Sequence, residues 1–175
     1  TVNYREAYGL HASNGILFNH ESPLRGMDFV TRKVCNYVGT VYWWHKFNRK
    51  NPVFKLKLGN LDAMRDWGHA KDFVKAMHLI IQQYKPGDYV VATGESRSIR
   101  ELLTEEFGYI GVDDWTPYVE TDQSLLRPAD VECLVGDSLK IRSLGWNPEY
   151  TFKAMIREMV ECEKLAGKES PWVGP

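Results

Sequence analysis

A strand, a short loop and a helix follow one another between residues 54 and 81, and this order constrains the fold most strongly. Apolar and basic residues alternate at residues 54–58, which predicts a strand, and Gly59-Asn60 supplies turn residues. A helical pattern follows, with an acid in its first turn: Asp72, then Phe73, Met77, Ile80 and Ile81 on one face, and Ala70 and Val74 at its edge. The pattern predicts an α/β unit whose loop carries Arg65, Trp67 and His69.

Arg65 is the best ligand-binding candidate in this predicted loop. A guanidinium can clamp a phosphate through two parallel hydrogen bonds, and a loop that carries large charged residues usually binds something. The alternative is a surface ion pair with Asp62 or Asp66. Taken alone, the residues favour the two interpretations about equally.

A second predicted strand, at residues 12–18, ends in polar side chains. Ile16-Leu17-Phe18 is typical of a buried strand, and Asn19-His20-Glu21-Ser22-Pro23 follows it. Ligands of open α/β sheets bind beyond the carboxyl ends of strands, which makes Asn19 and Ser22 candidate donors. The residues alone favour the alternative that both close a turn before Pro23.

Further patterns complete an α/β chain. They predict helices at residues 2–8, ended by Gly9; at 29–42, weakened by Gly39; at 98–107, opened by a Ser98/Glu101 capping box and ended by Gly108; and from Thr151, with Phe152, Met155, Ile156, Met159 and Val160 on one face. A further strand is predicted at residues 89–93.

Composition argues against several classes of protein. The chain has 175 residues, 43% of them hydrophobic, which suffices for one domain or most of one. Its 22 basic and 23 acidic residues give a net charge of −1, so no basic excess indicates nucleic acid. We find no signal peptide, no apolar run of membrane-spanning length and no metal-binding histidine spacing. Three widely spaced cysteines, Cys35, Cys133 and Cys162, predict reduced thiols and a cytoplasmic protein.

Residues 42–57 interleave aromatic and basic side chains and leave a second function open. Aromatics among cations can stack bases and hold phosphates, so this segment could belong to a nucleic-acid or nucleotide-sugar binding module. The alternative, which we favour, is a helix-to-strand connection whose aromatics fill the core and whose lysines are solvated.

Three stretches resemble the GDP-mannose 4,6-dehydratases, a family of extended short-chain dehydrogenases/reductases. They are the run from Gly59-Asn60-Leu61-Asp62 through Arg65-Asp66-Trp67-Gly68-His69-Ala70 to Asp72; Asn3-Tyr4-Arg5-Glu6-Ala7-Tyr8-Gly9 with Asn19-His20-Glu21-Ser22-Pro23 and residues 29–33; and Arg127-Pro128-Ala129-Asp130-Val131-Glu132 with Gly136-Asp137 and Leu144-Gly145-Trp146. The Asn-His-Glu-Ser-Pro and Arg-Asp-Trp-Gly-His runs are specific to this family.

The resemblance implies the C-terminal part of a Rossmann-like fold, joined to a small, mostly helical substrate-binding domain. Residues 1–175 are then the substrate-binding portion, interleaved with the last strands of the Rossmann-like domain. The family's Gly-rich dinucleotide loop does not occur in the chain, and Tyr4 is followed by Tyr8 where the Tyr-x-x-x-Lys pair would have lysine. We therefore expect the N-terminal half and the catalytic pair to be absent, so that another chain or the missing half of the enzyme would supply them.

The resemblance also implies a reaction and its partners. The family converts GDP-mannose to GDP-4-keto-6-deoxymannose with NADP: hydride leaves C4, water is lost across C5 and C6, and hydride returns to C6. We expect this chain to be inactive alone, the intact enzyme to be a homo-oligomer, and neither a membrane nor a nucleic acid to be a partner.

Site residues are carried over by resemblance as well. Those expected to bind substrate are Asn19, Lys33 and Arg65 at the diphosphate, Arg127 at the ribose or phosphate, Leu58, Gly59 and Asn60 around the guanine, and Asp130, in place of the usual glutamate, at the ribose hydroxyls. Thr31-Arg32-Lys33 would open a helix facing the phosphates. His20 and Arg25 would contact NADP, and Leu24 replaces an arginine that the family commonly has there.

Overall fold

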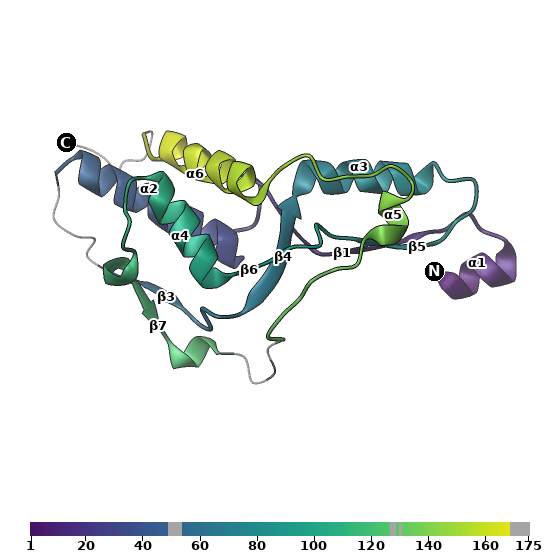
Figure 1. Cartoon of the computed structure of the whole chain (residues 1–175), viewed down its shortest axis with the longest axis horizontal. Helices are drawn as coiled ribbons and strands as arrows, with labels where there is room; N and C mark the ends of the chain where they lie inside the picture. Colours follow the sequence, from purple (N-terminus) through teal and green to yellow (C-terminus); the bar gives the residue numbers. More distant parts are fainter. Residues whose placement is uncertain (49–53, 127–128, 130, 169–175) are drawn as a thin grey trace. The chain divides into compact units, whose positions relative to one another are not determined.

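The computed structural model divides the chain into two compact units, each assembled from separate segments (Figure 1). Unit 1 comprises residues 1–21, 65–96 and 134–152, and unit 2 comprises residues 22–64, 97–133 and those from 153 onward. The structure describes residues 1–48, 54–126, 129 and 131–168. Because the segments alternate along the chain, each unit brings together stretches that are distant in sequence.

Helices and strands alternate through both units. In chain order they are α1 (Val2–Tyr8), β1 (Asn14–Leu17), β2 (Asn19–Glu21), α2 (Val30–Lys46), β3 (Leu56–Leu58), β4 (Met64–His69), α3 (Ala70–Ile81), β5 (Asp88–Val91), β6 (Ser96–Ser98), α4 (Ile99–Tyr109), the 3-10 turn η1 (Thr116–Tyr118), β7 (Val119–Thr121), the 3-10 turn η2 (Gln123–Leu125), α5 (Leu139–Arg142) and α6 (Phe152–Lys168).

Unit 1 is built on parallel strands covered by α3. β1 pairs with β5 in a register that runs from Asn14 opposite Asp88 to Leu17 opposite Val91. α3 runs beside these strands (Figure 1) and buries Phe73, Ala76 and Ile80 against them and against Trp146. The predicted strand at 12–18 is shorter than expected, and the chain enters β2 directly after Phe18. The predicted strand at 89–93 is β5.

The predicted loop that carries Arg65, Trp67 and His69 is wrong, because these residues form strand β4. β4 pairs in parallel with β2, with Asn19 opposite Trp67 and Glu21 opposite His69, in a sheet of order β2-β4-β6. It passes directly into α3 at Ala70. Asn19 likewise lies on a strand, whereas the Ser22 hydroxyl accepts from the Leu24 amide at 3.1 Å and closes the turn around Pro23.

The buried face of α3 also differs from the predicted one. Phe73 and Ile80 are buried as expected, but the side chains of Val74, Met77 and Ile81 are 60%, 40% and 62% exposed. α3 therefore carries apolar residues on two faces, and the periodicity of the sequence does not show which of the two is buried.

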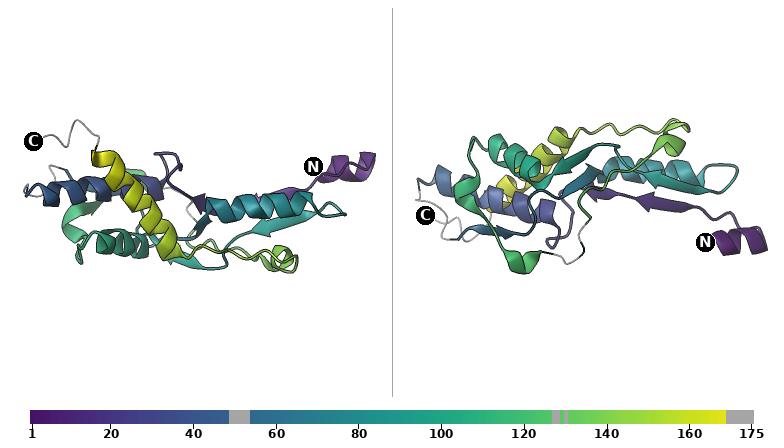
Figure 2. Two further views of the ribbon diagram at one scale, coloured as in Figure 1. Left: turned by 90° about the horizontal axis from the view of Figure 1, so that it is seen from above. Right: turned by 60° about the horizontal axis from the view of Figure 1, so that its bottom comes forward.

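Unit 2 packs α2, α4 and α6 together, beside the parallel pair β3–β7 (Figures 1 and 2). Gly39, expected to weaken the end of its helix, lies buried within α2, and a Cβ there would lie 2.8 Å from the Cβ of Glu163 on α6. Arg32 of α2 and Glu163 form an ion pair of 2.6 Å. The glycine therefore allows close approach of the two helices.

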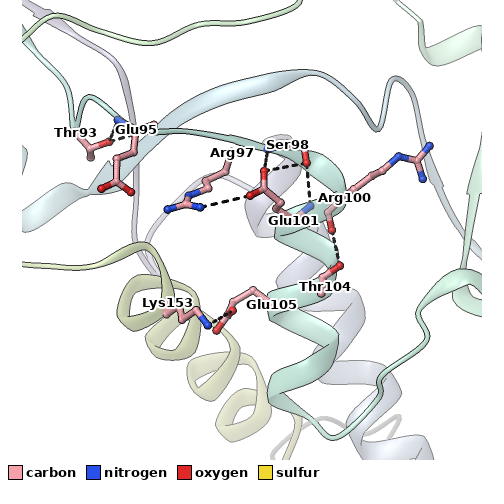
Figure 3. Close-up of polar contacts among 9 residues, drawn as sticks. All are labelled: Thr93, Glu95, Arg97, Ser98, Arg100, Glu101, Thr104, Glu105 and Lys153. Carbon is pink, nitrogen blue, oxygen red and sulfur yellow. Dashed lines mark hydrogen bonds and ion pairs between the residues drawn. The ribbon is translucent and has the colours of Figure 1, made fainter.

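The last two predicted helices are confirmed. Ser98 caps α4: its hydroxyl accepts from the Glu101 amide at 3.1 Å, and the Glu101 carboxylate accepts from the Ser98 amide at 2.8 Å (Figure 3). α4 continues past Gly108 to Tyr109. The predicted apolar face of α6 is also confirmed: Met155, Ile156, Met159 and Val160 are buried and Phe152 is half-buried.

The expectation that the aromatics of residues 42–57 fill the core holds only in part: residues 42–46 end α2 and Trp43 is buried, whereas Phe47 and Phe54 are 45% and 62% exposed. Trp43 is buried and its indole N–H donates to the Lys164 carbonyl at 3.0 Å. Phe47 stacks on Trp43, and Lys46 lies over the Trp43 ring at 5.0 Å. Lys57 forms ion pairs with Glu120 and Asp122. Residues 49–53 of this segment lie outside the described residues.

No helix within the described residues is long and apolar enough to cross a bilayer. In the same part of the chain, no group of three or more His, Cys, Asp or Glu side chains could hold a metal ion.

Candidate nucleotide-binding site

Asp66, on β4, fixes two loops of unit 1. Its buried carboxylate accepts four hydrogen bonds, from the amides of Thr93, Gly94 and Gly136 at 2.9, 2.9 and 3.2 Å and from the Thr93 hydroxyl at 2.6 Å. The Thr93 hydroxyl in turn accepts from the Glu95 amide at 3.1 Å (Figure 3). A buried carboxylate requires such compensation, so Asp66 serves the fold.

Trp67 and Gly68 are also committed to packing. Trp67 is buried and stacks on Phe152 with ring centroids 6.1 Å apart. A Cβ at Gly68 would lie 2.4 Å from the Phe73 ring and 2.9 Å from the Thr93 methyl carbon. Only glycine fits between strand and helix at this position.

His69 and Asp72 organise the start of α3. The Nδ1 atom of His69 accepts from the Lys71 amide at 3.0 Å, and the imidazole stacks on Tyr150 at 3.9 Å. The buried Asp72 carboxylate accepts from the Glu149 and Tyr150 amides, each at 3.0 Å. The acid that the sequence places at the helix dipole therefore also anchors the 146–150 segment.

Arg65 is half-buried on β4, beside the strand that carries Asn19 and His20. Asp62 accepts from Arg100 at 2.6 Å, and Asp66 accepts the four bonds described above. Asn19 and His20 are both half-buried, and His20 Nδ1 lies 2.9 Å from the Phe18 carbonyl while its ring stacks on Phe73. Unit 1 thus brings three predicted site residues onto two neighbouring strands.

In unit 2, Lys33 and Arg25 lie near the start of α2. Lys33 is exposed in the first turn. The Arg25 guanidinium carbon lies 3.4 Å from the centre of the Phe29 ring. The three residues Thr31-Arg32-Lys33 do open a helix, but of its two basic residues Arg32 pairs with Glu163 on α6 and Lys33 is exposed.

The predicted guanine-binding segment, Leu58 to Asn60, lies at the end of β3. Leu58 is buried, and its carbonyl accepts from the Asp122 amide at 2.8 Å. A Cβ at Gly59 would lie 2.8 Å from the Leu125 carbonyl oxygen. The Asn60 side chain accepts from the Asp62 amide at 2.9 Å. Arg127 and Asp130 lie outside the described residues.

Asp122 is a residue that sequence reasoning missed. Its carboxylate accepts from the Ser124 amide at 2.9 Å and from the Ser124 hydroxyl at 2.6 Å. These bonds, with help from Lys57, hold the pKa of Asp122 below its ordinary value. The sequence signal that could have identified it is the Asp122-x-Ser124 pattern just after a strand, because an aspartate side chain often closes a turn by accepting hydrogen bonds from the residue two positions on.

A Tyr-x-x-x-Lys spacing does occur, at Tyr42 and Lys46, so the expectation that the chain has none is wrong. Both residues lie in the last turns of α2. Lys46 Nζ lies 5.7 Å from the centre of the Tyr42 ring, and Lys164 Nζ lies 4.5 Å from it. The ring faces both ammonium groups, which is a cation–π arrangement.

Parallel strands flanked by helices define an α/β protein with the fold of the extended short-chain dehydrogenases/reductases. The structure of RMD from Pseudomonas aeruginosa complexed with NADPH matches with a TM-score of 0.77 at 20% identity, over 94% of this chain and 51% of that one. The dTDP-glucose 4,6-dehydratase of Bacillus anthracis, in complex with NAD, gives 0.76 at 15% identity, over 99% and 51%. The predicted fold class is confirmed.

Sequence comparison narrows the class to one family. A profile of the GDP-mannose 4,6 dehydratase family matches residues 1–159. GDP-mannose 4,6 dehydratase 2 of Arabidopsis thaliana is 52% identical over 171 residues, covering 97% of this chain and 44% of the relative. The chain therefore belongs to the GDP-mannose 4,6-dehydratase family and spans less than half the length of this relative.

Proposed function

We propose that this chain is the substrate-binding portion of a GDP-mannose 4,6-dehydratase and binds GDP-mannose. The observation that carries the proposal is the pairing of β2 with β4, which sets Asn19 and Arg65 on neighbouring strands in a member of this family. Arg65 can offer two parallel donors to a diphosphate, and the Asn19 amide can add another. Lys33, exposed at the first turn of α2 in unit 2, is proposed for a phosphate on the family resemblance alone, as a point charge.

The backbone around Gly59 is proposed to hold the guanine. Gly59 packs directly on the Leu125 carbonyl, where a Cβ would lie only 2.8 Å from the oxygen, and main-chain groups held in this way can read donors and acceptors on a base edge. Arg127 and Asp130, proposed for the ribose and phosphate, follow this segment in sequence.

The cofactor is proposed to be NADP, and the fold's NADPH- and NAD-bound neighbours support a nicotinamide cofactor. When bound, such a cofactor supplies reversible hydride transfer. His20 and Arg25 can offer ring and guanidinium donors to it, but the sequence contains no Gly-rich dinucleotide loop, so most of its contacts would come from a dinucleotide-binding half outside this sequence. We assign no catalytic residue to this chain.

Overall, the proposed reaction removes water from GDP-mannose and yields GDP-4-keto-6-deoxymannose without net oxidation, which is a lyase reaction that could feed GDP-fucose synthesis. We propose a homo-oligomer for the intact enzyme. A cytoplasmic location is supported by Cys35, Cys133 and Cys162, none of which forms a disulfide.

Titration calorimetry tests the proposed substrate. The full chain is titrated with GDP, GDP-mannose and UDP-glucose, and we expect GDP-mannose to bind at least about tenfold more tightly than UDP-glucose, a difference of about 1.4 kcal/mol. Equal affinity for the two sugars, or binding of neither, would overturn the proposal. Turnover is then sought with NADP after mixing the chain with the remaining half of the plant relative. We expect product from the mixture and none from either part alone.

A further inference from the structure

The segment at the end of β3 rests on the short turn that follows β7. Leu58 lies opposite Thr121 in the parallel pair, and the next residue, Asp122, donates its amide to the Leu58 carbonyl at 2.8 Å. Gly59 then meets the backbone of Leu125, because a Cβ at Gly59 would lie 2.8 Å from the Leu125 oxygen and 3.2 Å from its carbonyl carbon. The Leu125 backbone therefore fills this side of Gly59 and fixes how the two main chains meet.

Asp122 holds that turn in place. Its carboxylate accepts from both the amide and the hydroxyl of Ser124, and its carbonyl accepts from the Leu125 amide at 3.0 Å. Lys57, on β3, lies 3.8 Å from the same carboxylate. One side chain thus links the end of β3 to the turn that presents Leu125.

We propose that Asp122 is a positioning residue that fixes Leu125 against Gly59 and so sets the shape of a base pocket for a guanine nucleoside diphosphate. The inference rests on the proposed function. A pocket built from main-chain groups discriminates between bases only if those groups keep fixed positions, whereas contacts to the diphosphate are the same for every nucleotide. Loosening the turn should therefore reduce base selectivity more than overall affinity.

The test compares GDP with UDP on the full chain by calorimetry. Asp122→Ala should reduce the preference for GDP about tenfold, because the turn loses two charge-assisted hydrogen bonds. Asp122→Asn keeps an acceptor oxygen for Ser124 and should restore most of the preference. Asp114→Ala is the matched control: its carboxylate accepts from the Thr116 amide at 2.9 Å and hydroxyl at 2.7 Å, in a turn that precedes β7. The control should keep the wild-type preference.

Each outcome decides the inference. A wild-type chain that does not prefer GDP overturns both the proposed substrate and this inference. A wild-type preference that persists in Asp122→Ala overturns this inference alone, as does an equal loss of affinity for GDP and UDP. Circular dichroism establishes that each variant is folded. If Asp122→Ala does not fold, Ser124→Ala, which removes only the 2.6 Å bond, must lower the ratio of GDP to UDP affinity, or the inference fails.

Discussion

At the residue scale, residues 65–72 have two kinds of role: some hold the fold in place, and others could bind a ligand. The carboxylates of Asp66 and Asp72 are buried and accept main-chain hydrogen bonds, and Gly68 is required by the Phe73 ring. Arg65, by contrast, is half-buried and carries a planar fork of donors. Charged residues that look like ligands in a sequence can thus be anchors of the strand beside the ligand.

Asp66→Asn should destabilise unit 1 strongly. An amide in place of the carboxylate turns an NH2 group toward main-chain N–H donors, which leaves buried donors unsatisfied, and the expected loss in free energy of unfolding is about 3 kcal/mol or more. Asp137→Asn is the control, because that exposed carboxylate accepts a single amide hydrogen bond, from Leu139. Urea unfolding measures both variants. A change below about 1 kcal/mol for Asp66→Asn would show that the anchor is dispensable.

Arg65→Ala should weaken GDP binding more than it lowers stability. The lost charge-assisted hydrogen bonds are worth about 1.5–3 kcal/mol each, which predicts at least tenfold weaker binding. The GDP affinity of Arg65→Lys should lie between those of the wild type and Arg65→Ala, because lysine keeps the charge but loses the two parallel donors. Lys153→Ala, which removes an exposed ion pair with Glu105 on unit 2 (Figure 3), serves as the charge control. Calorimetry and thermal melting are run on all four proteins. Unchanged affinity with a lower melting temperature would assign Arg65 to the fold.

At the element scale, α1 is joined to unit 1 by polar contacts. None of its side chains is buried, and Arg5 holds it through two hydrogen bonds of 3.0 Å to Asp88 and one of 3.1 Å to the Ala12 carbonyl. The Arg5 and Asn14 side chains lower the pKa of Asp88 to about 2. The Arg5–Asp88 pair therefore controls how α1 is held.

The docking of α1 should weaken in acid. A depressed carboxylate pKa contributes stability that is present above the unfolded value of 3.8 and is lost as the pH falls through about 2. A carboxyl-carbon NMR titration should therefore give Asp88 a midpoint near 2, and Arg5→Gln should return it toward 3.8. An Asp88 midpoint that is the same in both proteins would show that Arg5 does not hold this carboxylate.

Local patterns predicted elements better than they predicted connections. The capping box of α4, the left-handed Gly9 after α1 and the buried face of α6 follow from short-range chemistry, and all three are observed. β4 was missed because its buried acid, Asp66, and its glycine, Gly68, look like loop residues until the hydrogen bonds that Asp66 accepts from Thr93 and Gly136 are known. The candidate site residues could be named from the family's motifs. The contact between Gly59 and Leu125 could not be predicted, because it joins segments that are distant in sequence.

At the scale of the whole molecule, the two units cannot be recognised from the order of segments along the sequence. Each unit takes segments from three places, so no linker composition marks a boundary. The net charge of −1 likewise gives no long-range attraction for polyanions, and two cations of residues 42–57 have local contacts: Lys46 with Trp43 and Lys57 with Glu120. These observations favour a small anionic ligand over a nucleic acid.

Single-stranded oligonucleotide should therefore bind weakly, with a dissociation constant on the order of 10⁻⁴ M or weaker at physiological salt. Trp43→Ala should instead cost about 3–5 kcal/mol of stability, because Trp43 is buried, donates to the Lys164 carbonyl and fills the space beside Gly167. Trp44→Ala, at a half-buried position on the same helix, is the matched control and should cost less. Fluorescence anisotropy across a salt series measures binding, and urea unfolding measures stability. A tight, salt-sensitive complex that Trp44→Ala abolishes while the protein stays folded would favour a nucleic-acid surface at residues 42–57. Loss of binding without loss of stability would mean that the Trp44 ring contacts the ligand.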